Sequence, residues 1–213
     1  HIFPVLNPNQ TANAMFNISI DPATTPGTPV FFEYHVSSGG YSAEKAYIMM
    51  VGLIYEDFES GDFSKFSWTF DGNLPWTITN VGPYEGVFAA KSGAITHSQS
   101  TQMILEYEVG ASDSISFFRK VSSENNYDFL RFFINGAQVA QWSGNVPWGR
   151  VAFPVSPGPK VFKWEYMKDN IVSSGEDCAW IDYIIFPPPV LCSSPENLFA
   201  SDISVNSALL NWD

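Results

Sequence analysis

The sequence predicts an all-β protein built around one jelly-roll β-sandwich. Short runs that alternate apolar and polar residues are separated by turn residues, and no stretch shows sustained helical periodicity. Aromatic residues make up 16% of the chain, enough to fill a packed core. Two acidic, aromatic segments, 56–63 and 174–182, bound a stretch that contains six of the seven tryptophans, counting Trp180 in the second segment. We expect these segments to be the first and last strands of one sandwich, meeting in space.

Residues 55–187 form the predicted sandwich, with turn signals between its strands. Asn135-Gly136 lies between two apolar runs and is a strong signal for a two-residue hairpin. The candidate strands are Ser67–Phe70, Trp76–Asn80, Met103–Val109, Ser114–Val121, Phe129–Ile134, Val139–Trp142, Val151–Val155, Lys160–Tyr166 and Ala179–Phe186. Strands of this number and spacing are typical of a sandwich or jelly roll.

Shorter segments flank the sandwich. Residues 1–54 read as strands only, at 14–20, 30–36 and 46–54, which are too few for a complete domain. They fit the last part of an immunoglobulin-like sandwich whose upstream part lies elsewhere. After the stiff linker Pro187-Pro188-Pro189, residues 188–213 resemble the first two strands of a fibronectin type III domain, with Trp212 as its core tryptophan.

Composition excludes several function classes. The formal net charge of −12 disfavours binding to nucleic acid and suits an extracellular, calcium-binding protein. No apolar run is long enough to span a bilayer. The sequence contains no phosphate-binding glycine loop and no cysteine–histidine spacing typical of zinc. Cys178 and Cys192 could pair, or Cys178 could be a buried free thiol.

The sandwich segment carries a set of motifs in consistent order. They are Glu56-Asp57-Phe58-Glu59, Trp68, Gly72-Asn73-Leu74-Pro75-Trp76, Glu85-Gly86, Ala90-Lys91-Ser92-Gly93, Ser123 to Asp128, Ser143-Gly144, Trp148, Trp164-Glu165-Tyr166 and Gly175 to Asp182. With these motifs the segment resembles the cleaved-adhesin jelly roll of gingipain-type bacterial surface proteins and the MAM-like sandwiches. That resemblance implies calcium near the ends of the jelly roll and, for residues 1–54, the tail that follows a caspase-like cysteine peptidase.

The acidic segments supply the first predicted metal site. On a strand, Asp57 and Glu59 project to one side while Phe58 enters the core. Asp177 and Asp182 arrive on the closing strand, where their odd spacing places them on opposite faces. We expect Asp177 to be the ligand and Asp182 to brace a turn. Calcium takes six to eight oxygen ligands and suits this set, although the same acids could be solvated surface residues.

Three further hypotheses concern single clusters. Glu124 and Asp128 could hold a second Ca2+, or Asp128 could cap backbone amides in a hairpin. Trp76 and Trp148 each follow a proline near a turn and are the likelier exposed pair for stacking on a sugar, although most tryptophans of a sandwich are core. A hydrolase would need two acids across a cleft, and the calcium site accounts for the same residues.

The sequence therefore favours a non-catalytic adhesion or substrate-targeting module. We expect it to belong to a secreted, multidomain protein of the bacterial cell surface, for which a gingipain-like cysteine peptidase is one candidate, and to bind a host or matrix glycan or protein. A calcium-stiffened spacer between neighbouring domains of the same chain is the alternative, and a carbohydrate-active hydrolase is less favoured.

Overall fold

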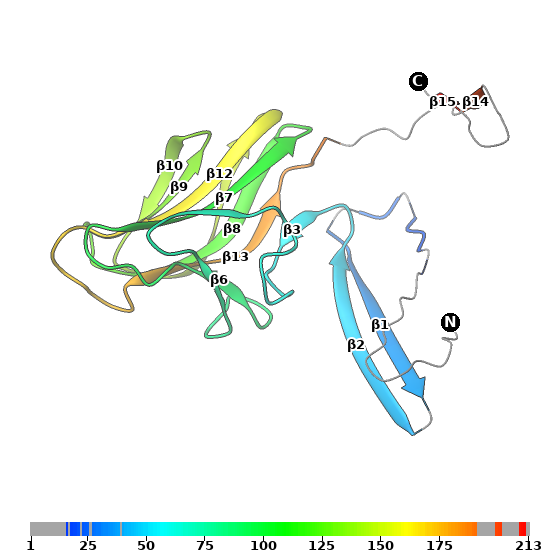
Figure 1. The fold of residues 1–213 in the computed structure, drawn as a ribbon, viewed down its shortest axis with the longest axis horizontal. Coiled ribbons are helices and arrows are strands. Elements are labelled where there is room, and N and C mark those ends of the chain that lie inside the picture. Colours follow the sequence, from blue (N-terminus) through cyan, green and yellow to red (C-terminus); the bar gives the residue numbers. More distant parts are fainter. Residues whose placement is uncertain are drawn as a thin grey trace. The chain divides into compact units, whose positions relative to one another are not determined.

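The computed structural model describes residues 16, 18–21, 23–25, 27–38, 40–190, 199–201 and 209–211 (Figure 1). The chain divides into two compact units, His1–Leu53 and Ile54–Asp213. All the regular elements in the described ranges are β-strands, so no helix there could cross a membrane. The all-β prediction is confirmed.

The first unit contains one antiparallel hairpin, with full register from Pro29↔Met50 to Ser38↔Tyr41. Its strands are β1 (Pro29–Ser38) and β2 (Tyr41–Met50). The strand expected at 14–20 is not formed at residues 16 and 18–20, and the strand expected at 46–54 is wrong in its bounds, because residues 51–52 form a turn. The immunoglobulin-like assignment of this unit stays a prediction.

The second unit is the predicted sandwich. Its strands are β3 (Ile54–Glu56), β4 (Thr69–Gly72), β5 (Thr77–Thr79), β6 (Ala89–Lys91), β7 (Ser100–Val109), β8 (Asp113–Ser122), β9 (Phe129–Ile134), β10 (Ala137–Trp142), β11 (Asn145–Val155), β12 (Gly158–Met167) and β13 (Cys178–Phe186). Two short strands, β14 (Phe199–Ser201) and β15 (Leu209–Asn211), pair with each other. Their assignment to a fibronectin-like domain stays a prediction, and Cys192 and Trp212 lie outside the described residues.

Two antiparallel sheets form the layers of the sandwich. Sheet 1 has the order β10-β9-β12-β7-β4, and sheet 2 has the order β11-β8-β13-β6-β5, with β3 added beside β13. The first and last strands meet as expected, with Glu56 opposite Ile184 and Ile54 opposite Phe186. Asn135 and Gly136 both have positive φ, 50° and 78°, as a two-residue hairpin between β9 and β10 requires.

Aromatic rings fill the space between the sheets. Phe117 of sheet 2 lies 4.9 Å from Phe132 and 5.4 Å from Trp164 of sheet 1, measured between ring centroids. Trp68 contacts Trp164 at 5.8 Å. These side chains are buried, and offset or edge-on aromatic pairs of this kind stabilise a core beyond their area alone. The rigid core fixes where the strand ends, and the loops that carry the acids, can lie.

Candidate functional site

Strand β13 positions acidic residues at two separate places. Asp182 lies within the strand, and Asp177 immediately precedes it. Both positions depart from regular strand geometry: Asp177 has φ +59° and Tyr183, next to Asp182, has φ +46°. Such values are uncommon for residues other than glycine and indicate that surrounding contacts hold the backbone there. Each acid anchors a different loop.

Asp182 holds the loop that connects β5 to β6. Its Oδ2 accepts hydrogen bonds from the backbone N–H of Tyr84 at 2.9 Å and of Glu85 at 3.3 Å. Its Oδ1 accepts one from Tyr183 N–H at 2.7 Å. The side chain is fully buried. Burial raises the pKa of Asp182 to about 7, although these three backbone hydrogen bonds act in the opposite direction. Asp182 thus braces a turn, as the sequence suggested.

Glu59 holds the same loop from its other end. Its Oε1 accepts the backbone N–H groups of Val87 at 2.8 Å and Phe88 at 2.9 Å. Asp57 forms an ion pair with Lys65 at 3.0 Å. Strand β3 ends at Glu56, and Phe58 has φ +59°, so the strand geometry predicted for Asp57 and Glu59 is wrong. Phe58 nevertheless enters the core as expected, being fully buried.

Glu85 lies in this loop and is a fourth acid beside Asp57, Glu59 and Asp182. It was not among the site residues predicted from the sequence. Burial raises its pKa, and the charges of Asp57 and Glu59 raise it further. We call Asp57, Glu59, Glu85 and Asp182 the loop cluster. Asp182 and Glu59 already accept backbone amides, and Asp57 already faces a lysine, so most of the negative charge of this cluster is matched by the chain itself.

A second group of acids lies at the other end of β13. One carboxylate oxygen from each of Glu124, Asp128 and Asp169 lies within 4.8 Å of the other two. Glu124 and Asp128 come from the loop between β8 and β9, and Asp169 follows β12. Asp128 is fully buried and its Oδ1 accepts the backbone N–H of Asp169 at 2.9 Å. We call these three residues the carboxylate triad.

One buried lysine neutralises part of this region. Lys168 Nζ lies 3.2 Å from Asp128 Oδ2 and also forms an ion pair with Asp177 Oδ2. Tyr166 donates a hydrogen bond from its hydroxyl to Asp177 Oδ1 at 3.1 Å. Burial alone would lower the pKa of Lys168, but the hydrogen bonds to Asp177 and Asp128 hold it above its usual value. The single positive charge of Lys168 is therefore shared by two carboxylates, those of Asp128 and Asp177.

Glu124 carries the unmatched charge. Its Oε2 is closed off from solvent and has no hydrogen-bond partner, while the rest of the side chain is half-buried. Burial raises the pKa of Glu124, and the neighbouring Asp169 and Asp128 raise it further. A buried acceptor without a donor is costly, and a cation would relieve both the missing contact and the repulsion. The carboxylate triad is therefore an arrangement that could hold a metal ion.

The structure separates residues that the sequence analysis placed together. Glu56 lies opposite Ile184, so Asp57 is close to position 183 of the partner strand. Asp177 lies six positions earlier along the chain, roughly 20 Å away at the rise of a β-strand. Asp177 therefore does not share a site with Asp57 and Glu59. It lies instead beside Lys168, next to the triad.

The two predicted sugar-stacking tryptophans have different environments. Trp76 is 2% exposed and belongs to the core, so its expected exposure is wrong. Trp148 is half-buried on β11, and its Nε1 donates a hydrogen bond to the carbonyl of Gly82 at 3.0 Å. Tyr84 packs edge-on against it, with ring centroids 6.2 Å apart. Whether Trp148 binds a ligand stays a prediction.

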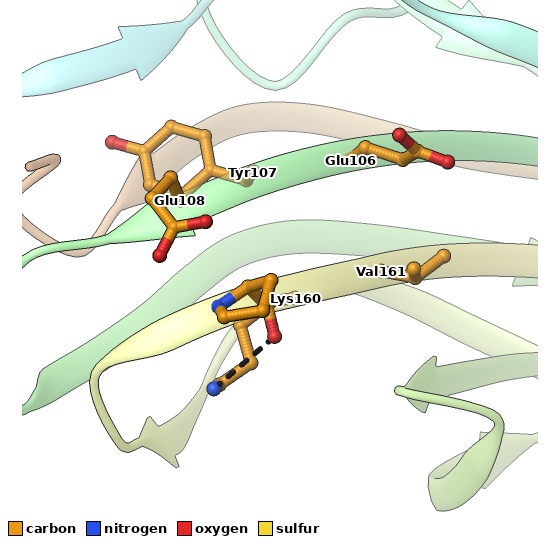
Figure 2. Close-up of a pocket in the computed structure, with 6 residues that line it drawn as sticks. Glu106, Tyr107, Glu108, Lys160 and Val161 are labelled. Carbon is orange, nitrogen blue, oxygen red and sulfur yellow. Dashed lines mark hydrogen bonds between the residues drawn. The ribbon is translucent and has the colours of Figure 1, made fainter.

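A shallow hollow of about 330 Å³ lies on the exposed side of sheet 1 (Figure 2). Its cation is already satisfied, because Lys160 Nζ donates to the carbonyls of Pro157, Gly158 and Pro159. The Tyr107 hydroxyl likewise donates to the carbonyl of Pro187 at 2.8 Å. The remaining polar side chains of the hollow are the exposed carboxylates of Glu106 and Glu108, which lie on the surface and not in an enclosed site, so it is a weaker candidate than the acid clusters.

Comparisons with known proteins identify the fold. No family model and no curated protein matches the chain. The K2 cleaved adhesin domain of Lys-gingipain matches 63% of this chain and 97% of its own length, with TM-score 0.50 and 13% identity. TmCBM61, solved with β-1,4-galactotriose, matches 62% of this chain and 94% of its own, with TM-score 0.45 and 18% identity. The xylan-binding CBM22-1 domain of Paenibacillus barcinonensis Xyn10C matches 65% and 95%, with TM-score 0.45 and 15% identity. The sandwich thus has the fold of the cleaved adhesin domains.

Proposed function

We propose that the sandwich is a non-catalytic, calcium-stabilised adhesion or targeting module of a secreted bacterial surface protein. The carboxylate triad carries this proposal, above all the buried and unpartnered Oε2 of Glu124. A cation there would face three carboxylates, while Lys168 pairs with Asp128 and Asp177 and balances only part of their charge. The first flanking unit would be the tail of an immunoglobulin-like domain after a cysteine peptidase, and the last strands would open a fibronectin-like domain.

Calcium fits the triad better than other common metals. All the ligand atoms are carboxylate oxygens, which hard cations prefer, whereas zinc favours nitrogen and sulfur. Glu124 and Asp128 lie in an irregular loop, and calcium tolerates irregular geometry and completes six to eight ligands with water or carbonyl oxygens. Magnesium demands a near-ideal octahedron and gives up its water reluctantly.

The separation of the predicted carboxylate pair argues against a hydrolase. Glycoside hydrolysis needs two carboxyl groups about 5–9.5 Å apart across the scissile bond. Asp57 and Asp177 lie roughly 20 Å apart by the strand register, and Glu59 is occupied by two backbone amides. Asp182 has a raised pKa, as a general acid would, but its oxygens are buried and bonded to the loop.

The exposed side of sheet 1 supports a binding role. Five polar side chains stand opposite one another in a single row that crosses all five strands: Asp71, Gln102, Glu165, Arg131 and Gln141. Gln102 donates to Glu165 at 2.8 Å, whereas the Nε of Arg131 is buried without a partner. We call this set the polar row. A line of hydrogen-bonding groups on a flat sheet suits the hydroxyls of a glycan chain.

The chain ends of the sandwich favour adhesion over the spacer alternative. Ile54 and Phe186 are paired directly, so the chain enters and leaves the sandwich at one point. A module attached in this way projects from the chain and does not lengthen it. A linear spacer would instead have its two chain ends far apart.

Thermal melting tests the metal proposal. Calcium added at about 100 times its dissociation constant should stabilise the fold by about 2.7 kcal/mol, which raises the midpoint by roughly 8 °C over the value in EDTA. Magnesium should do much less. Asp169→Asn should remove the calcium shift, and Glu59→Gln, in the loop cluster, should retain it. A shift that survives Asp169→Asn but disappears in Glu59→Gln would place the metal in the loop cluster and overturn this assignment.

A glycan screen with calcium-loaded protein tests adhesion. Arg131→Gln should weaken binding to any glycan found by about tenfold, because glutamine removes the charged guanidinium, whose terminal N–H groups would donate to the glycan from the polar row. Arg150→Gln, the same change at an exposed arginine of β11 on sheet 2, serves as the matched control and should have little effect. Calcium stabilisation with no glycan bound at all would favour the spacer.

A further inference from the structure

The outer side of sheet 2 carries a buried tryptophan that does not belong to the core. Trp180 lies between Ala179 and Ile181, whose side chains enter the core, so its indole projects to the opposite side of the sheet. It is nevertheless only 2% exposed. Something on the outer side must therefore cover the ring.

Two lysines provide that cover. Lys120 on β8 and Lys91 on β6 stand directly opposite Trp180, one on each side. Their ammonium nitrogens lie 4.1 Å and 5.3 Å from the centroid of the same ring. The two charges are therefore no farther apart than the sum of these distances. Each is attracted by the indole face, but they repel each other.

Few negative charges balance this pair. Glu176 lies 3.6 Å from Lys120, and its side chain is 57% exposed, so it is free to move. Lys91 forms a hydrogen bond with the Cys178 thiol, and within residues 54–190 no carboxylate forms an ion pair with it. The ammonium groups of Lys91 and Lys120 thus have one neighbouring counter-charge, the exposed carboxylate of Glu176.

The other lysines of the sandwich show that this arrangement is unusual. Lys65, Lys163 and Lys168 each face a carboxylate, and Lys160 is bonded to backbone carbonyls. The chain carries 22 acidic residues against 10 basic ones, so acidic partners are plentiful. Within residues 54–190, Lys91 is the lysine with neither a carboxylate nor a backbone carbonyl as partner, and Lys120 beside it has only the exposed Glu176, which leaves room for an external anion.

We propose that Lys91 and Lys120, with Trp180 beneath them, bind one carboxylate or sulfate group carried by a mostly neutral glycan. An anionic group held against one of the two ammonium groups is also attracted by the other, because both nitrogens lie close to the same ring. A polyanion would be repelled at longer range by the net charge of −12. Thr77, exposed and opposite Lys91 on β5, supplies a hydroxyl for the neighbouring sugar. The site needs no metal, so it stands independently of the carboxylate triad.

Nuclear magnetic resonance titrations of the intact chain test the site through the indole N–H of Trp180. The probes are methyl β-D-glucuronide, glucose 6-sulfate and the uncharged methyl β-D-glucoside. We expect the glucuronide, the sulfate or both to shift the Trp180 signal saturably, with the glucoside at least tenfold weaker. Which charged probe binds more tightly distinguishes a uronate from a sulfate ester. Equal binding of the glucoside, or no saturable shift with either charged probe, would overturn the proposal.

Glutamine variants identify the lysines. Lys91→Gln and Lys120→Gln should each weaken binding about tenfold, since glutamine keeps much of the stem that covers the ring but removes the charge. Lys163→Gln is the matched control, because Lys163 also lies 4.1 Å from an aromatic centroid, that of Phe133, but on sheet 1 and beside Glu165. An equal loss in the control would refute the site. If a Lys91 variant fails to fold, Lys120→Gln carries the test, and undiminished binding in that variant would overturn the site.

A heparin tetrasaccharide separates one anionic group from many. We expect it to bind no more tightly than the single-charge probes, because the surrounding acids repel its additional sulfates. Much tighter heparin binding that is lost in both lysine variants would replace the proposed ligand with a polyanion.

Discussion

The two ends of strand β13 carry aspartates whose partners differ. Asp182 meets three backbone N–H groups and needs no other partner. Asp177, five positions earlier, relies on Lys168, which it shares with Asp128 of the carboxylate triad. At the Asp182 end, backbone N–H groups supply the hydrogen-bond donors. At the Asp177 end, two carboxylates share one lysine, and Glu124 Oε2 has no partner. The role of an acid thus depends on what points toward it.

The same contrast applies to what each end can do. Amides fix the carboxylates of the loop cluster in place and thereby fix the loop between β5 and β6. The carboxylate triad has excess acceptors, which is what a cation requires. If this comparison is right, the stability of the triad end should depend on Lys168 and on added metal, whereas the stability of the Asp182 end should depend on pH.

Removing the buried cation should have the largest effect. Lys168→Met leaves Asp128 and Asp177 without their shared partner, and breaking a buried ion pair in this way costs about 3–5 kcal/mol of unfolding free energy. Urea denaturation in EDTA measures the loss. Calcium should recover part of it, because a metal at the triad would supply the missing positive charge.

Lys163→Met is a suitable control for that change. Lys163 also pairs with an acid, Glu165, but its side chain is 24% exposed, so its loss should cost no more than about 1 kcal/mol. Equal losses of unfolding free energy in Lys168→Met and Lys163→Met would mean that the buried ion pairs of Lys168 stabilise the fold no more than the partly exposed pair of Lys163.

The Asp182 end should show a smaller, pH-dependent effect. The folded-state pKa of about 7 lies above the ordinary value of 3.8, so the native state holds a proton that the unfolded state has lost between these values. In EDTA, unfolding free energy should therefore fall as pH rises through that window, by up to about 1.4 kcal/mol per unit. Asp182→Asn should flatten this slope. A slope unchanged in that variant would assign it to other acids, such as Glu56.

Most of the fold could be predicted from local patterns. Each strand expected in residues 55–187 overlaps an observed one, and Phe129–Ile134 matches in full. Strand β6 was missed, since three residues are too short to display alternation, and the expected opening strand at 56–63 overlaps β3 only at Glu56. The short hairpin at Asn135-Gly136 was recognisable because only positive φ values allow that turn.

The site was less predictable because its contacts are distant in sequence. Glu124 and Asp128 were found together because they share one loop, but Asp169 lies 41 residues beyond Asp128 and joins it only through the ends of β9 and β12. Asp177 was assigned to the wrong partners because its left-handed backbone is invisible in the sequence. An acidic residue beside Lys168, directly after a long strand, is the one signal that could have suggested the triad.

The pairing of Ile54 with Phe186 also has a mechanical consequence. A pulling force transmitted along the chain would enter the sandwich at two adjacent strand ends. Antiparallel strands pulled from neighbouring ends separate one hydrogen-bonded pair at a time and do not slide past each other as a block. Under flow or shear, β3 would therefore peel from β13 well before the aromatic core yields, with the Ile54–Phe186 pair opening first and Glu56 and the acids beside it following.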